Sequence, residues 1–265
     1  MRAIWSGALS FGLVNIPVKL YSASVEREIK LHFLHKEDLS PIHYARVCAA
    51  EEKEVPYEDI VKGYDYGGGN YVILTDQDFQ KANVHAAKTI EILDFAAQKQ
   101  IDPVFYEKPY FLEPEKGSAK AYALLREAIN KSKKVAIAKF VLRNREHLGA
   151  ILPRGKALVL NQMRFLEEIR EDEDLKLPAN TAIKDKEMDV ALSLIERLSG
   201  PFKPQEYKDT YAGELRQIIE EKAKGKKPKP KGKAPQATEV TDLMAMLQAS
   251  LRKEKRHEKQ KQHAR

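Results

Sequence analysis

The opening segment, residues 1–23, restricts the chain to a fold that begins with β-structure. Apolar and β-branched stretches in this segment are interrupted by Gly7, Gly12 and Pro17. Short apolar stretches separated by such residues are typical of strands that meet at turns or bulges. The opening therefore predicts a β-rich start.

Further strand signals follow as far as about residue 180. Residues 29–33 alternate apolar with polar side chains, which is the pattern of a half-buried strand. Residues 64–74 place three consecutive glycines between aromatic and β-branched arms, which predicts a hairpin. A phosphate-binding loop is the alternative for the glycines, but the required Lys-Ser/Thr pair and the following helix are missing. Three more strands are predicted at residues 134–142, 149–152 and 157–160.

One helix is predicted among these strands, over residues 118–131. Ser118 is a candidate N-cap for this helix. Apolar residues then recur at helical spacing, at Ala121, Leu124, Leu125, Ala128 and Ile129. Strands that surround one or two helices indicate a barrel-like α+β core that is mostly β.

The chain changes character after the last predicted strand. Four consecutive carboxylates at residues 171–174 indicate a solvated loop, because neighbours in sequence cannot all face one metal ion. Helices are predicted over 186–198 and 210–221. Lysine alternates with Gly, Pro and Ala over 222–233, which predicts a flexible cationic linker. An apolar stripe over 240–251 predicts a last helix, which docks on its own core or binds a partner or DNA.

The formal net charge of +7 is unevenly distributed. Residues 222–265 contain 14 Lys and Arg against 4 Asp and Glu, whereas residues 1–221 contain 32 against 35. The positive excess therefore lies in the tail. The globular part can bind nucleic acid only where its basic groups gather on one surface.

No pattern of a catalytic, cofactor or metal site is found. The sequence has no nucleophile elbow, phosphate-binding loop, two-histidine zinc helix or EF-hand. Cys48 is the single cysteine and cannot form an internal disulfide, which fits a reducing cytoplasm. No apolar run approaches the length of a membrane-spanning helix, and the N-terminus lacks the pattern of a secretory signal. We therefore expect a cytoplasmic protein with no catalytic residue, cofactor or metal.

A series of motifs runs in order from the N-terminus to about residue 170. After the opening segment they are Arg46–Cys48, Val55–Tyr64, Tyr71–Asp76, Thr89–Leu93, Ile101–Val104, Lys108–Leu112, Lys120–Arg126 and Leu142–Asn144. On these motifs the chain resembles bacterial Ku, a family that binds broken DNA ends. Many relatives continue the cysteine motif as Cys-x-x-Cys-Gly, whereas Cys48 is followed here by Ala-Ala-Glu. A single thiolate leaves a zinc shell mostly empty, so we expect Cys48 to be a structural residue of a strand or turn.

The resemblance implies an organisation for the whole chain. It implies a Ku-type β-barrel core over 1–180 with an inserted bridge arm over about 26–97. A helical region over 181–221, a Lys/Pro/Gly linker over 222–237 and a basic, amphipathic helical tail over 238–265 follow. An arm of two strands with about ten residues each would extend about 33 Å.

The resemblance also implies the function and the partners. Members of this family form a homodimeric ring that threads onto linear double-stranded DNA in non-homologous end joining, without being enzymes. The implied protein partner is ligase D, with its contact at about residues 189–221. The implied location is the cytoplasm, in association with the nucleoid.

Six residues are candidates for contacts with DNA phosphates. Lys30 and His32 face away from the apolar side of the strand expected at 29–33, and Lys36 shares their parity. Arg46 lies in a family-like motif, and Arg143 and Arg145 lie in the polar turn before the strand at 149–152. The alternative for each residue is an ordinary solvated charge.

Two other functions remain open. One is an enzyme acting on DNA ends, a lyase or a nuclease, although no lysine or carboxylate cluster is marked for either role. The other is a general nucleoid-binding protein driven by the basic tail. A tail-driven protein binds circular and linear DNA alike, whereas a ring discriminates between them.

Overall fold

The computed structural model describes residues 1–25, 27–82, 88–173, 175–178 and 183–226, together with positions 246 and 249. The chain divides into two compact units, Met1–Asp172 and Glu173–Arg265. Of the linker expected over 222–237, only positions 222–226 lie within the described residues. The tail helix expected beyond it lies outside them, apart from the two isolated positions.

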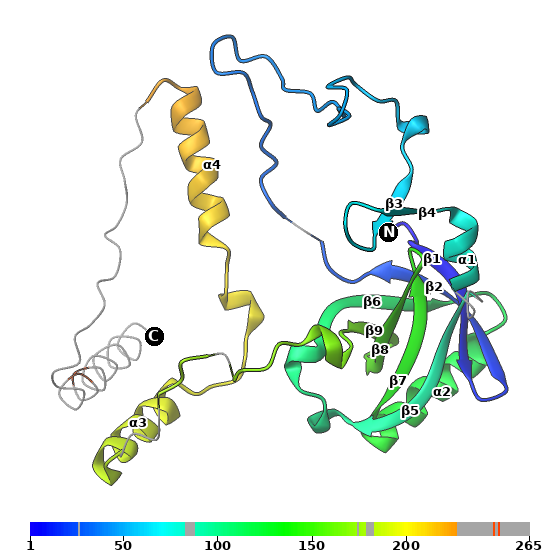
Figure 1. Ribbon diagram of the computed structural model, residues 1–265. Coiled ribbons are helices and arrows are strands. Elements are labelled where there is room, and N and C mark those ends of the chain that lie inside the picture. Colours follow the sequence, from blue (N-terminus) through cyan, green and yellow to red (C-terminus); the bar gives the residue numbers. More distant parts are fainter. Residues whose placement is uncertain are drawn as a thin grey trace. The chain divides into compact units, whose positions relative to one another are not determined.

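The first unit is built on a closed barrel of seven strands (Figure 1). Around the barrel the order is β1-β2-β6-β9-β8-β7-β5. Neighbouring strands are antiparallel except β1 and β5, which pair in parallel and close the barrel. The strands are β1 (Trp5–Phe11), β2 (Val14–Ser22), β5 (Thr89–Ala97), β6 (Tyr106–Pro114), β7 (Lys134–Leu142), β8 (Arg145–Arg154) and β9 (Ala157–Met163). The β-rich start and the barrel-like α+β core are thus confirmed.

Gly7 makes the closure of the barrel sterically feasible. The amide of Ala8 donates to the carbonyl of Lys88, just before β5 begins, at 2.8 Å. A Cβ atom on Gly7 would overlap that same carbonyl and the ring of Trp5. Glycine inside a strand often marks such a close backbone approach. The residue that interrupts the first apolar stretch is therefore required by the fold.

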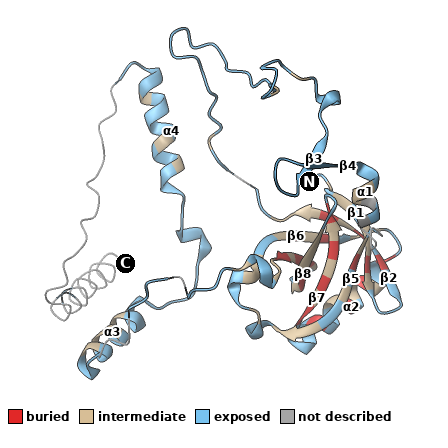
Figure 2. Cartoon of the chain, viewed as in Figure 1, coloured by how far each residue is buried: buried red, intermediate tan, exposed pale blue. Residues whose placement is uncertain are grey.

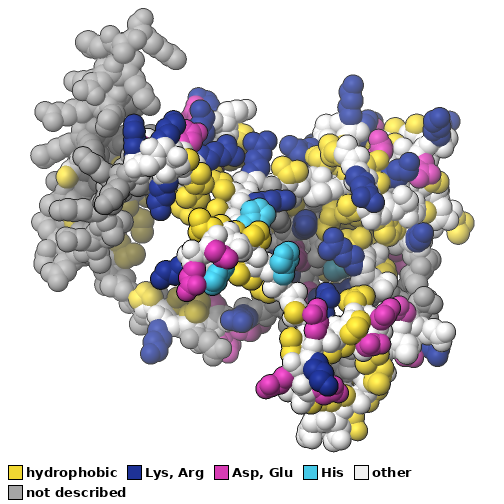
Figure 3. Space-filling model, turned by 90° about the horizontal axis from the view of Figure 1, so that it is seen from above, with side chains coloured by type: hydrophobic (Ala, Val, Ile, Leu, Met, Phe, Trp, Pro, Cys, Tyr) yellow, Lys and Arg dark blue, Asp and Glu magenta, His cyan; other side chains and the backbone are white. Residues whose placement is uncertain are grey.

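The core fills the inside of the barrel. On β2 the alternate residues Ile16, Val18 and Leu20 are inaccessible to solvent, as expected where successive side chains point to opposite faces. Figure 2 shows the buried residues concentrated on the barrel strands. The charges lie outside: on the face in Figure 3, Lys and Arg side chains are interspersed with Asp and Glu.

Helix α2 (Ala119–Ser132) packs on the barrel with a different set of residues from the one expected. Leu125 and Ile129 are buried as predicted. Leu124 is 72% exposed and Ala128 is also exposed, so the assignment of these two residues to the buried face is wrong. Tyr122 is buried instead, at 5% exposure. Ser118 occupies the N-cap position, although its hydroxyl donates to backbone carbonyls outside the helix rather than capping it.

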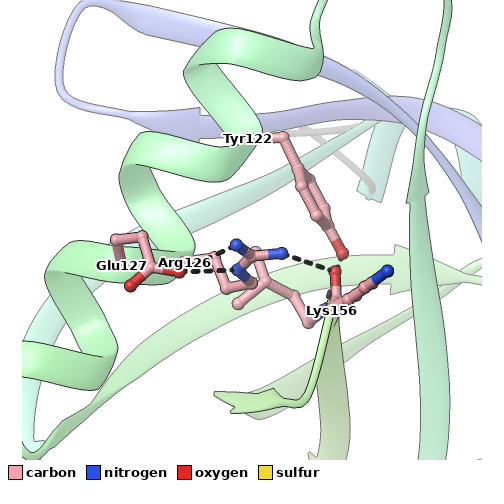
Figure 4. A network of polar contacts seen from close by, with 5 residues as sticks. Tyr122, Arg126, Glu127 and Lys156 are labelled. Atoms are coloured by element: carbon pink, nitrogen blue, oxygen red, sulfur yellow. Dashed lines mark hydrogen bonds and ion pairs between the residues drawn. The ribbon is translucent and has the colours of Figure 1, made fainter.

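Tyr122 can be buried because its hydroxyl is fully paired. The hydroxyl donates to the carbonyl of Leu112 on β6 at 2.7 Å and accepts from the amide of Leu158 on β9 at 2.6 Å. One turn later, Arg126 donates to the carbonyl of Lys156 at 2.9 Å (Figure 4). Two polar side chains thus fix α2 to the strands beside it.

The segment between β2 and β5 forms little regular structure. It contains a short 3-10 helix (Tyr57–Asp59), the hairpin of β3 (Lys62–Asp65) and β4 (Tyr71–Leu74), and α1 (Asp76–Ala82). The three glycines of the hairpin loop all have positive φ, so the predicted hairpin is confirmed. Because β5 is a barrel strand, the inserted segment ends before Thr89 and does not extend to residue 97 as expected.

The strand expected at residues 29–33 is wrong. Leu31 and Phe33 are each 72% exposed, and the nearest backbone pairing is an isolated bridge between Leu34 and Pro41. The expected arm of two ten-residue strands is wrong for the same reason. An alternating sequence becomes a strand only when another strand pairs with it, and the described part of this chain offers none here.

The described part of the second unit up to residue 226 contains helices α3 (Asp185–Leu198) and α4 (Thr210–Ala223), close to their predicted bounds. Neither helix has a fully buried residue. The remaining 3-10 helices of the described chain are Gln98–Gln100, Pro103–Phe105, Leu166–Glu168 and Pro204–Glu206. No described helix combines the length and the apolar composition needed to cross a bilayer.

Replacing Tyr122 by phenylalanine should destabilise the barrel by about 1–3 kcal/mol, because the variant leaves two buried backbone groups without their partner. Trp5, the single tryptophan, lies on β1 and reports barrel unfolding by fluorescence in urea. Tyr21→Phe is the matched control, since the Tyr21 hydroxyl donates to Glu113 at the surface. An equal, small effect of both variants would contradict the anchoring role of Tyr122.

Candidate nucleic-acid interface

The inserted segment carries four of the six predicted phosphate contacts. The side chains of Lys30, His32 and Lys36 are exposed and form no ion pair or hydrogen bond with any described residue. The Arg46 guanidinium lies 5.1 Å from the centroid of the Tyr57 ring. Stacking on a ring leaves the N–H groups at the guanidinium edge available. All four side chains can therefore reach an external anion.

The other two predicted contacts meet at the turn between β7 and β8. Arg143 and Asn144 form this two-residue turn and both have positive φ, which gives the primed geometry preferred in hairpins. Arg143 is exposed and has no ion-pair partner within the described residues. Arg145 donates to Glu168 at 2.5 Å. The turn thus offers one guanidinium without an ion-pair partner among the described residues, that of Arg143, and one in an ion pair, that of Arg145.

The partner of Arg145 is ionised at neutral pH. The amide of Phe165, followed by the charge of Arg145, holds the pKa of the Glu168 carboxyl below its usual value. A phosphate that binds Arg145 must therefore compete with a carboxylate. We expect Arg145 to contribute less to DNA binding than Arg143.

A cavity of about 420 Å³ opens beside this turn. Arg143 and Arg145 line it together with Lys108 from β6 and His147 from β8. Glu107 is the carboxylate among the lining residues. The structure therefore gathers several nitrogen-bearing side chains around one concave site.

A short hydrogen-bond chain joins three residues that line this cavity. The Tyr110 hydroxyl donates to the side-chain carbonyl of Gln162 at 3.2 Å, and the Gln162 amide donates to Glu107 at 2.9 Å. Both Tyr110 and Gln162 are buried. Burial raises the pKa of the Tyr110 phenol, and the charge of Arg143 opposes this shift. Tyr110 and Gln162 are thus neutral, polar parts of the lining, and the chain ends at the Glu107 carboxylate.

His147 is a neutral member of the lining at pH 7. Its ring lies 5.4 Å from that of Phe140, centroid to centroid. Burial lowers the pKa of the imidazole, and the charge of Arg145 lowers it further, while Glu107 and Glu168 act in the opposite direction. The imidazole donates to the backbone of Leu142, which also opposes the shift. The single N–H of the neutral ring is therefore engaged, and the other ring nitrogen is an acceptor.

Lys108 and His147 were missed by the sequence prediction. His147 follows Arg145 by two positions on β8, so the strand period could have placed both residues on one face. Lys108 lies on β6, which reaches the cavity only because β6 pairs with β9 and β9 with β8. The register between these strands cannot be read from a local sequence pattern. The six predicted contacts thus form two groups, one on the inserted segment and one on the β7–β8 turn.

Cys48 is a turn residue, as predicted. Its amide donates to the carbonyl of Lys53 and its carbonyl accepts from the amide of Glu52, both at 2.8 Å. Within the ranges that the structure describes, no three His, Cys, Asp or Glu side chains gather as metal ligands do. One thiolate without such a cluster does not fit a zinc site.

Comparison with known proteins gives consistent matches over nearly the whole chain. The family model described as Ku70/Ku80 beta-barrel domain matches residues 10–190. A protein of Opitutus terrae is 43% identical over 258 residues, covering 95% of this chain and 91% of the relative. A protein of Anaeromyxobacter is 45% identical (94% and 85% covered), and one of Bacillus subtilis is 39% identical (97% and 83% covered). All three are named non-homologous end joining protein Ku.

The depressed pKa of His147 predicts a pH dependence of stability. Below the ordinary histidine value of 6.5, the unfolded chain binds a proton that the folded chain does not. The free energy of unfolding should therefore fall as the pH decreases through this window. Urea unfolding at about pH 7.5 and about pH 5.5 should show a smaller loss for His147→Gln than for the wild type. Identical losses in the two proteins would contradict the assignment.

Proposed function

This chain belongs to the Ku family, and we propose that it binds the ends of double-stranded DNA in non-homologous end joining, as a homodimer without catalytic activity. The observation that carries the proposal is the match of the barrel family over residues 10–190, joined to relatives of that name that match over 83–91% of their own length. We expect the protein to act in the cytoplasm, in association with the nucleoid.

Lys and Arg side chains without a carboxylate partner among the described residues support binding to the DNA backbone. DNA ends of any sequence share the phosphate backbone, so a sequence-independent binder relies on Lys and Arg contacts and on counterion release. Lys30, Lys36 and Arg143 have no carboxylate partner among the described residues. Arg46 lies against an aromatic ring and has no ion-pair partner in the described ranges. We propose these four residues, with His32 and Arg145 as weaker members, as the phosphate contacts.

Exposed apolar side chains on the inserted segment support a homodimer. Leu31, Phe33, Tyr44 and Val61 are all exposed, and they lie in a part of the chain that has few strand pairings of its own. A large exposed apolar surface marks an interaction site. A second copy related by a two-fold axis would cover both segments at once and supply strand partners. Two such segments could then surround a duplex.

Helices α3 and α4 are the proposed contact for ligase D, at about residues 189–221. On α3, Met188, Leu192 and Ile195 share one face at helical spacing and are exposed. An uncovered apolar stripe on a short helix fits a groove on a protein partner. This surface is separate in sequence from the proposed DNA contacts.

End binding is tested by competition at about 150 mM salt. A labelled linear duplex is challenged with the same sequence as an unlabelled linear fragment or as a covalently closed circle. We expect the linear competitor to displace the probe and the circle to fail, because entry into a ring requires a free end. Equal competition by the circle would contradict the ring and favour tail-driven, general nucleoid binding. Cleavage or end modification of the duplex during the assay would instead indicate an end-processing enzyme.

Homodimer formation should depend on the inserted segment. The double variant Leu31→Asp, Phe33→Asp should sediment as a monomer where the wild type sediments as a dimer, because the charges oppose burial of this surface. Leu13→Asp is the control, since Leu13 is fully exposed at the β1–β2 turn. An unchanged dimer in the double variant would place the interface elsewhere.

A further inference from the structure

The cavity beside the β7–β8 turn has the size of a ligand site. Its volume of about 420 Å³ falls within the range of about 300–1,000 Å³ of small-molecule pockets. A DNA backbone that passes over an exposed turn needs no such cavity. This concave site is therefore large enough to admit a ligand group.

The charges around the cavity fit a dianion. Lys108 and Arg143 both line it, and neither forms an ion pair within the described part of the chain. Arg145 is paired with Glu168, and Glu107 is the single carboxylate in the lining. A phosphomonoester carries a charge of about −1.5 to −2 at pH 7, whereas a backbone phosphodiester carries one charge. Two uncommitted cations match the monoester better.

The backbone at Arg143 gives a second, independent reason. Its φ of +54° is a conformation that favours Gly, Asn or Asp, and Asn144 with φ +62° follows it. An arginine at the first position of such a turn is costly for the backbone, so the geometry of the turn does not account for its presence. A guanidinium held at the mouth of the cavity does account for it.

A neutral donor on Gln162 completes the lining. Gln162 presents a carboxamide whose nitrogen carries two N–H groups, one of them donated to Glu107. The imidazole of His147 adds no charge at pH 7, and its single N–H is engaged by the backbone of Leu142. The remaining N–H of the carboxamide can orient a phosphate without adding charge. Glu107 opposes an anion, and its removal should therefore strengthen binding.

We propose that this cavity binds a phosphomonoester, supplied in the proposed function by the 5′-phosphate of a DNA terminus. This inference rests on the proposed end binding and adds a chemical preference to it. The phosphomonoester of a free nucleotide has the same chemistry, so the test separates the two sources.

The test uses the full-length protein and two duplexes that differ only in a 5′-phosphate or a 5′-hydroxyl at each end. We expect the phosphorylated duplex to bind about tenfold more tightly, the value of one charge-assisted hydrogen bond. Equal affinity for both duplexes would overturn the inference and leave end binding intact. Loss of binding to both duplexes would overturn the proposed function itself.

Variants locate the preference in the cavity. Arg143→Asn removes the charge while keeping a residue suited to positive φ, and should abolish the preference for the phosphate. Glu107→Gln keeps an acceptor for Gln162 and should increase it. Lys99→Asn is the control, because Lys99 is exposed and does not line the cavity. An equal loss of preference in the Arg143 and Lys99 variants would indicate general electrostatics and overturn the assignment.

Competition with AMP and with adenosine separates the sources. If AMP removes the preference for the 5′-phosphate and adenosine does not, the cavity accepts a phosphomonoester from either source. If neither competes while the preference persists in the wild type and disappears in Arg143→Asn, the cavity takes the phosphate only as part of a DNA end. If both compete equally, the cavity recognises the nucleoside, and the phosphate assignment is wrong.

Discussion

The parallel pairing of β1 with β5 is the constraint on which the rest of the structure depends. It closes the barrel, so that no strand edge of the described core is left open. Since β2 runs antiparallel to β1 and β5 runs parallel to it, the chain leaves β2 and re-enters β5 towards the same end of the barrel. The residues between these two strands form an insertion that contributes no strand to the barrel. Gly7 permits this arrangement, because any side chain there would collide with the backbone that leads into β5.

The inserted segment and the barrel core therefore differ in how their backbone groups and apolar side chains are satisfied. The barrel satisfies its own backbone and buries its own apolar residues. The inserted segment leaves apolar side chains such as Leu31 and Phe33 in solvent. Where it is described, its β-pairing outside the one hairpin consists of isolated bridges. A second copy of the same segment is the simplest partner that could satisfy both needs, which is why the dimer and the DNA-enclosing role are proposed together.

Sequence patterns correctly predicted those elements whose structure depends on residues close together in the chain. The hairpin around the three glycines, the strand β7 and the helices α2, α3 and α4 were all predicted, because turn chemistry and periodicity act over a few residues. The strand at 29–33 failed because its pairing partner is not found in the described chain. The sequence predicted that Leu124 is buried, whereas the structure buries Tyr122. Tyr122 can be buried because its hydroxyl hydrogen-bonds to β6 and β9, outside its own helix, where helical periodicity gives no information. Lys108 was missed for a similar reason, since only strand register brings it beside Arg143.

In the proposed function, affinity and end selectivity have separate origins. The part of the chain before the basic tail is slightly acidic overall, so the globular part must bind through local cations that have no ion-pair partner. A ring would supply the requirement for a DNA end.

Topological trapping tests the ring most directly. Protein is loaded on a linear duplex, the DNA is ligated into a circle, and the complex is challenged with high salt. Enclosure predicts that the protein stays on the circle and is released when a restriction enzyme opens it. Release from the closed circle as rapidly as from the linear duplex would contradict enclosure.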